Sequence, residues 1–388
     1  MKKAFINGKI ITTDGIIWDG AVVVENGIIT AADKSEKVEI PKDAEIIDVN
    51  GLYIAPGLID IHNHGVGTSL FVDDPKSCCD LLVQHGVTTV LPTIYNNLSL
   101  EQMLNGAKLI EEVSKTGSGR IMDGYYMEGP YMCVGLGSFK NQLKWQGDIT
   151  REEYMPLLDA VGEKARVWAI DPARENIEMF MADVRKMFPN AIFTLGHSNA
   201  TAEQCRKVKK YGVTLQTHHS DSGKAKGLNQ VSIGAGCDEY TLYSPDMYAE
   251  LIVDQTGVHI VGDLVKLVIK TKGVERIILI SDSMPKTNDY LNNEAEGIGY
   301  GPDLNYDDMG HLAGSRLYLD NAVKNVMAHT GYGLCHAFRF ASYNPACMLG
   351  IDDTVGSIEV GKRANIIIVD DAVDVKKVFL DGQAVYEK

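Results

Sequence analysis

Six residues that can ligate a metal ion or transfer a proton follow apolar, strand-like runs in this chain of 388 residues. Two of them form a His-x-His pair, in which the period of two puts both imidazoles on the same face of an extended strand. Together they offer nitrogen and oxygen donors without cysteine, which suits zinc, iron(II), manganese or cobalt in a catalytic site rather than a structural zinc site. The six are His62, His64, Glu128, His197, His218 and Asp282.

Hydrolysis is the chemistry that this constellation favours. A divalent ion bound to histidines and carboxylates makes hydroxide available near neutral pH, and a neighbouring carboxylate can carry the proton. Each residue alone has an ordinary alternative, since Asp282 could cap a helix and Glu128 could be a loop carboxylate. Four histidines and two carboxylates gathered at one place need a cation between them, because buried charges must be compensated. The set as a whole therefore predicts a metal centre.

Eight apolar runs alternate with helical stretches through the middle of the chain, and five of them end in these candidates. Near-continuous apolar runs are typical of parallel strands buried on both faces. Eight such strands predict an α/β fold, a (β/α)₈ TIM barrel with its active site at the carboxyl ends of the strands. A doubly wound open sheet is the alternative, although no GxGxxG follows the first strand. The runs span residues 58–64, 87–93, 121–128, 166–171, 191–197, 213–219, 248–254 and 276–282.

Both chain ends are rich in short β-type segments, which predicts a small β-sandwich module built from the two ends together. We assign residues 1–53 and 351–388 to this module and residues 54–350 to the barrel. Asx-Gly pairs between apolar segments are strong hairpin signals. They predict turns at Asn7-Gly8, Asp14-Gly15, Asp19-Gly20, Asn26-Gly27 and Asp381-Gly382.

Composition excludes several classes of partner. The chain has 37 basic and 52 acidic residues, a net charge of −15, which predicts no nucleic-acid partner and no anionic membrane surface. No apolar run approaches the roughly 18 residues of a transmembrane helix, and the N-terminus lacks the apolar core of a signal peptide. Seven scattered cysteines without a CxxC pair predict a reduced, cytoplasmic protein.

Several motifs resemble the amidohydrolase superfamily and, within it, the N-acetylglucosamine-6-phosphate deacetylase family. The matching segments run in order from about residue 50 to 370 and include residues 56–64 (PGLIDIHNH), 127–131 (MEGPY), 195–200 (LGHSNA), 279–284 (LISDSM) and 312–315 (LAGS). The resemblance implies a cytoplasmic, metal-dependent hydrolase that removes the acetyl group from N-acetylglucosamine-6-phosphate or a close analogue. It also implies a small-molecule amino sugar substrate and a homodimer.

The resemblance assigns roles to individual residues. Glu128, His197 and His218 would hold the main ion, and His62 and His64 a second one, giving one or two divalent ions per subunit, zinc or else iron, manganese or cobalt. Asp282 would take the proton of the attacking water and pass it to the leaving amine. A substrate-contacting histidine of the family matches His259.

The absence of a lysine on the fourth strand distinguishes between branches of the superfamily. Many relatives bridge two metals with a carboxylated lysine on the fourth strand, whereas residues 166–171 (RVWAID) contain no lysine. This argues against hydrolases of cyclic amides and leaves Glu128 as the carboxylate ligand, as in the deacetylase branch. The alternatives are an amidohydrolase acting on a different amide (a cyclic amide or another N-acyl compound), a deaminase and a non-catalytic barrel scaffold.

The substrate loop departs from the family pattern. After His218 the family continues with an Asn-Ala pair and later an arginine that reaches the substrate phosphate, whereas this chain has Asp221, Ser222, Lys224 and Lys226. Asp221 would repel a phosphate, and a lysine is not a bidentate equivalent of arginine. Residues 133–144 also lack the basic, histidine-bearing stretch of the family. We therefore expect retained hydrolytic chemistry with an altered substrate, and treat these four loop residues as substrate-binding candidates.

Overall fold

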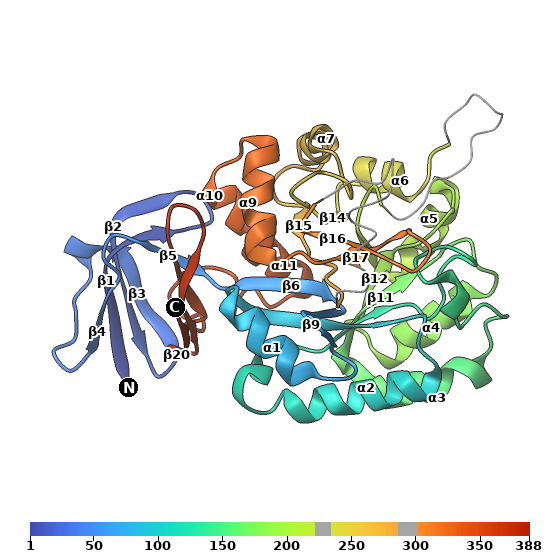
Figure 1. Cartoon of the computed structure of the whole chain (residues 1–388), viewed down its shortest axis with the longest axis horizontal. Coiled ribbons are helices and arrows are strands. Elements are labelled where there is room, and N and C mark those ends of the chain that lie inside the picture. Colours follow the sequence, from blue (N-terminus) through green and yellow to red (C-terminus); the bar gives the residue numbers. More distant parts are fainter. Residues whose placement is uncertain (222–233, 286–300) are drawn as a thin grey trace.

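A barrel of parallel strands and a sheet formed by both chain ends make up the protein (Figure 1). The structure, a computed structural model, describes residues 1–221, 234–285 and 301–388. Both termini lie on the sheet at one side of the barrel (Figure 1). Within the described residues, every helix is too short or too polar to span a lipid bilayer.

The eight predicted barrel strands are all present, parallel and paired in the order β15-β14-β13-β12-β11-β10-β9-β6. Their interiors are almost fully buried, as the near-continuous apolar runs predict. This confirms the α/β barrel expected from the sequence. The strands are β6 (Leu58–Asn63), β9 (Val87–Tyr95), β10 (Tyr125–Glu128), β11 (Ala165–Ile170), β12 (Ile192–Leu195), β13 (Val213–Gln216), β14 (Tyr248–Leu251) and β15 (Ile277–Leu279).

The barrel closes between its first and last strands through hydrogen bonds beyond the end of β15. The backbone N–H of Asp282 donates to the carbonyl of His62 at 2.9 Å, and the N–H of His64 donates to the carbonyl of Ser283 at 2.9 Å. The buried carboxylate of Asp60 accepts from the Ser281 hydroxyl at 2.6 Å. The strand that carries the His-x-His pair is thereby tied directly to the segment that carries Asp282.

Helices between the strands cover the outside of the barrel (Figure 1). In α2, Ser99 and Gln102 form a reciprocal capping box, and the buried face contains Met103 and Ile110. The helices are α1 (Pro75–Gln84), α2 (Leu100–Val113), α3 (Arg151–Val161), α4 (Ile177–Met187), α5 (Ala202–Val208), α6 (Cys237–Tyr243), α7 (Gly262–Lys272), α9 (Leu319–Thr330), α10 (Leu334–Phe338) and α11 (Asn344–Leu349). Two short antiparallel pairs are added by β7 (Gly65–Val66) with β8 (Ser69–Leu70) and by β16 (Leu304–Tyr306) with β17 (Leu312–Ser315).

The chain ends form one mixed sheet in the order β20-β19-β18-β5-β1-β2-β3, with β4 paired to β1. Its two halves pack face to face, so that the rings of Phe5 and Phe379 meet edge-on with centroids 4.8 Å apart. The division at residues 53/54 and 350/351 stays a prediction. The strands are β1 (Lys2–Ile11), β2 (Ile16–Glu25), β3 (Ile28–Lys34), β4 (Glu45–Asp48), β5 (Tyr53–Pro56), β18 (Ile366–Val369), β19 (Val375–Leu380) and β20 (Gln383–Glu387).

Two of the five predicted turns are wrong. Asn7-Gly8 lies inside β1 and Asp19-Gly20 inside β2, and both sites fall at or beside irregularities in the register of these two strands. At Asn7 the chain has φ 57°, which produces a bulge rather than a reversal. By contrast, Asn26-Gly27 connects β2 to β3 with φ of 50° and 85°, the positive values of a type I′ hairpin. The Asx-Gly dipeptide alone therefore does not distinguish a bulge inside a strand from a turn between two strands.

Candidate active site

The candidate ligands stand at the carboxyl ends of five barrel strands, where the chain leaves the sheet. His62 lies in β6 and Glu128 ends β10, whereas His197, His218 and Asp282 lie two or three residues beyond the ends of β12, β13 and β15. The last three have φ of 41°, 24° and 47°, which non-glycine residues adopt rarely and at a cost of about 1–3 kcal/mol each. Such backbone strain is concentrated at functional sites, and here it marks three of the six residues singled out in the sequence.

Glu128 is the centre of the first group of ligand atoms. Its Oε1 lies 3.0 Å from Nε2 of His197 and 3.4 Å from Nε2 of His218. The side chains of Glu128 and His218 are buried, at 9% and 4% exposed, whereas that of His197 is 22% exposed at the edge of the group. Among the described residues, these three form one of two clusters whose ligand atoms all lie within 4.8 Å of one another.

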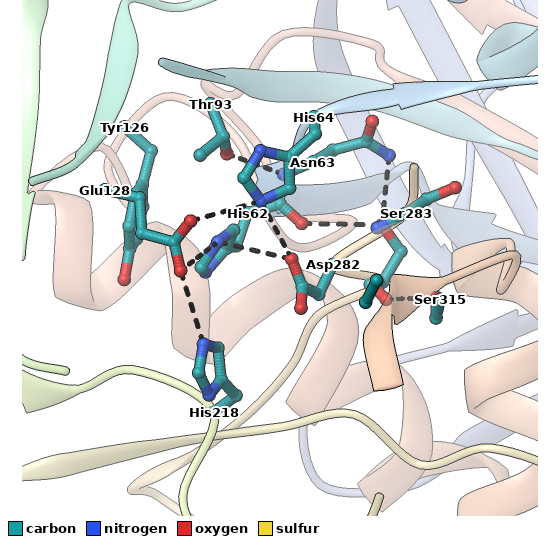
Figure 2. Close-up of polar contacts among 12 residues, drawn as sticks. His62, Asn63, His64, Thr93, Tyr126, Glu128, His218, Asp282, Ser283 and Ser315 are labelled. Carbon is teal, nitrogen blue, oxygen red and sulfur yellow. Dashed lines mark hydrogen bonds and ion pairs between the residues drawn. The ribbon is translucent and has the colours of Figure 1, made fainter. Parts of the chain in front are cut away.

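Asp282 is the centre of the second cluster, together with the His-x-His pair. Its Oδ1 lies 3.0 Å from Nε2 of His64 and 3.4 Å from Nε2 of His62. The two clusters adjoin, because Glu128 Oε2 lies 3.4 Å from Nε2 of His64 (Figure 2). The structure thus gathers all six sequence-predicted candidates around one centre.

Electrostatics at this centre favours positive charge. Burial alone would raise the pKa of Glu128, but hydrogen bonds from His197 and His218 hold it well below the usual range. Burial alone would lower the pKa of His218, but its hydrogen bond to Glu128 and the charge of Asp282 raise that pKa to about 10. The two carboxylates thus draw positive charge onto buried groups, which a bound divalent cation would supply.

The donor set fits two neighbouring divalent metal ions. In the described part of the chain, Nε2 of His62 is buried and has no hydrogen-bond partner. Nitrogen and oxygen donors in two adjoining groups of three are typical of binuclear hydrolytic sites. Thr93 in β9 supports this arrangement. Its hydroxyl accepts a hydrogen bond of 2.9 Å from the backbone N–H of Asn63, which lies between the paired histidines (Figure 2).

A pocket of about 220 Å³ opens above these ligands. Its walls come from the loop after β9 (Asn96, Asn97), from residues 136–139 and from the β17 region (Leu312, Gly314). The N–H of Phe139 donates to Oδ2 of Asp307 at 2.9 Å, which joins the loop after β10 to the turn between β16 and β17. Residues 133–144, where the sequence departs from the family pattern, therefore supply part of the pocket above the candidate ligands.

His259 and Asp221 also line this pocket, and they touch each other. Nδ1 of His259 lies 2.7 Å from Oδ2 of Asp221, and the side chain of His259 is 1% exposed. Burial opposes the charge on His259, but the nearby carboxylate raises its pKa. The predicted substrate residues Ser222, Lys224 and Lys226 lie outside the described residues.

Glu250 is a polar residue at the centre that sequence reasoning missed. It lies in β14, is 0% exposed, and places Oε2 3.3 Å from Nδ1 of His62. The ring of Tyr126 stacks on that of His62, with centroids 4.2 Å apart, and its hydroxyl donates to Glu250 at 3.4 Å. The available signal was a carboxylate inside the apolar run 248–254, four residues before Asp254 at the end of that run.

Comparison with known proteins matches this architecture. The sequence model of the Amidohydrolase family covers residues 53–385. The chain belongs to the amidohydrolase family. Within that family it is 28% identical to N-acetylgalactosamine-6-phosphate deacetylase of Escherichia coli O157:H7, over 97% of each chain. It is 27% identical to N-acetylglucosamine-6-phosphate deacetylase of Haemophilus influenzae, over 95% of each.

A solved structure of an amidohydrolase extends the likeness to three dimensions. The crystal structure of N-acetylglucosamine-6-phosphate deacetylase from Thermotoga maritima superposes with a TM-score of 0.79 at 27% identity. The match covers 99% of this chain and 100% of that one. The likeness therefore includes the sheet built from both chain ends as well as the barrel.

Proposed function

We propose that this chain is a metal-dependent deacetylase of an N-acetylated amino sugar phosphate. The observation that carries the proposal is the pair of adjoining ligand triads at the mouth of the barrel, with Asp282 facing the same pocket. Full-length similarity to deacetylases of both the glucosamine and the galactosamine 6-phosphates supports this substrate class. The reaction is N-acetylglucosamine-6-phosphate, or its galactose epimer, plus water, giving the free amino sugar phosphate and acetate.

Two groups of residues would hold the metal. Glu128, His197 and His218 bind one divalent ion, and the His-x-His pair with Asp282 binds a second. When bound, such ions polarise the acyl carbonyl and make hydroxide available near neutral pH. Zinc is the metal that we propose, and iron, manganese and cobalt share its preference for these donors.

Asp282 carries the proton in this mechanism. Its carboxylate faces the pocket and takes a proton as the oxygen of water bonds to the acyl carbon. It then donates that proton to the amine nitrogen as the carbon–nitrogen bond breaks, so that the amine leaves neutral. The backbone turns at Asp282, with φ 47°, and Oδ1 of its carboxylate lies beside Nε2 of His62 and Nε2 of His64.

His259 and Asp221 would orient the sugar. Asp221 accepts a hydrogen bond from Nδ1 of His259, which leaves Nε2, buried and without a hydrogen-bond partner among the described residues, for a substrate hydroxyl. Among the described residues, the pocket lining holds no lysine or arginine. We therefore assign the substrate phosphate to Lys224 and Lys226, and keep Ser222 as a further candidate from the same stretch of sequence. A homodimer and a cytoplasmic location, which the family resemblance implies, complete the proposal.

Acetate release by metal-loaded protein tests the proposal. The substrates are N-acetylglucosamine-6-phosphate, N-acetylgalactosamine-6-phosphate and unphosphorylated N-acetylglucosamine. We expect turnover of at least one phosphorylated sugar and a much lower kcat/KM for the unphosphorylated one. Absence of turnover for all three at full metal occupancy would overturn the substrate class and leave another amide as the target.

A further inference from the structure

Glu250 is a charged group buried in the wall of the barrel, and the mechanism above gives it no task. Its side chain is 0% exposed, in the middle of β14. Taking a carboxylate out of water costs several kcal/mol unless other groups compensate. Its compensating contacts come from β6, from β10 and from the turn after β13, and two of the three involve proposed metal ligands.

The first contact sets the state of His62. Nδ1 of His62 lies 3.3 Å from Oε2 of Glu250, so with the carboxylate oxygen as acceptor Nδ1 carries the proton of this hydrogen bond. Nε2 of His62 is then left as a lone pair facing Asp282, at 3.4 Å from Oδ1. The stacked ring of Tyr126, whose hydroxyl is also bonded to Thr217 at 2.7 Å, fixes the plane of the imidazole.

The second contact holds His218, a ligand of the other triad. The backbone N–H of His218 donates to Oε2 of Glu250 at 3.2 Å, and the N–H of His219 donates to the Glu250 carbonyl at 2.8 Å. These two hydrogen bonds hold the backbone at His218, where φ is 24°. That strained turn is what brings Nε2 of His218 to 3.4 Å from Glu128.

We infer that Glu250 is a positioning residue that holds one ligand from each triad, and so couples the two metal subsites through a single carboxylate oxygen. The inference rests on the metal assignment proposed above and deepens it. Groups that orient metal-bound histidines in this way commonly change metal affinity by about 10–100-fold when removed. A carboxylate with a merely local packing role would leave the affinity for both ions unchanged.

Metal titration of the whole chain tests this. We compare wild-type apoprotein with E250M, which keeps the size but removes the acceptor, and with E250Q, whose amide oxygen can still accept. E250M is expected to bind each ion about 10–100-fold more weakly than wild type, and E250Q to recover part of this loss. D320N is the matched control, because Asp320 is a buried carboxylate in the first turn of α9 whose side chain pairs with His85 and with neither triad.

Each outcome decides the inference. Wild-type affinity for either ion in E250M would overturn the coupling, because both ligands depend on the same oxygen. If E250M does not fold, as judged by circular dichroism of the apoprotein, E250Q decides alone, and wild-type affinity for both ions in it would overturn the inference. Wild-type protein that binds no ion would refute the metal assignment instead, so the two failures are distinguishable without any activity measurement.

Discussion

Replacing Asp282 by asparagine removes the proposed proton carrier with little change in shape. Asparagine tolerates the left-handed backbone that Asp282 adopts, with φ 47°, so D282N avoids the strain that alanine would add. It also keeps an oxygen at the place that lies 3.0 Å from Nε2 of His64. What it loses is the ability to accept a proton.

Loss of general acid–base catalysis costs about 10²–10⁴ in rate, which is about 2.7 to 5.4 kcal/mol of activation free energy at about 1.36 kcal/mol per tenfold change. We expect kcat for acetate release to fall in that range while KM changes little. The ion held by Glu128, His197 and His218 should remain, because that triad does not include Asp282.

The assay pairs initial rates of acetate release with metal content measured on the same samples. D320N serves as the matched control, since Asp320 is a buried acid that pairs with His85 at 3.1 Å and contacts none of the candidate ligands. It should keep wild-type kcat. A D282N variant that retains more than about a tenth of wild-type kcat with its metal in place would refute the assignment, because proton transfer contributes at least about 10².

Three further perturbations have definite expected outcomes. E128Q should lose the ion held by Glu128, His197 and His218, because it removes the carboxylate of that triad; metal analysis that finds that ion at wild-type occupancy would contradict this. D221N should raise KM about tenfold and change kcat less, because a hydrogen bond to a charged group is worth about 1.5–3 kcal/mol. An unchanged KM in steady-state kinetics would exclude Asp221 as the group that orients His259. F5A should destabilise the sheet of the chain ends by about 3–5 kcal/mol, because Phe5 packs on Phe379; calorimetry showing an unaltered melting temperature would count against that core.

The barrel and the ligand set could be predicted from sequence because both depend on local patterns. Buried parallel strands leave near-continuous apolar runs, and a strand that ends in a polar residue must place it at the mouth. His62, Glu128 and His218 follow from this rule without knowledge of the contacts between strands. The same rule does not reveal which ligands share an ion, because that depends on the closure of the barrel.

Other features depend on long-range packing and could not be read from sequence. Glu250 sits 188 residues from His62 along the chain, and an acidic residue inside an apolar strand carries no signal of its partner. Asn7-Gly8 is a typical dipeptide of hairpin turns, but because β1 pairs with β2 and β4 it forms a bulge in a long strand. His259, a predicted substrate contact, pairs with Asp221 of the substrate loop that departs from the family pattern. These two residues lie 38 positions apart in the sequence, and the fold brings them together.

Stepwise metal loading of the chelated apoprotein, with acetate release from the two N-acetylated sugar 6-phosphates followed at each step, tests the central claim most directly. The two ligand triads predict that the rate is negligible without metal, rises with the ions bound and levels off when the triads are filled. Full turnover in the chelated protein, or no acetate release at full occupancy, would contradict metal-dependent deacetylation at this site.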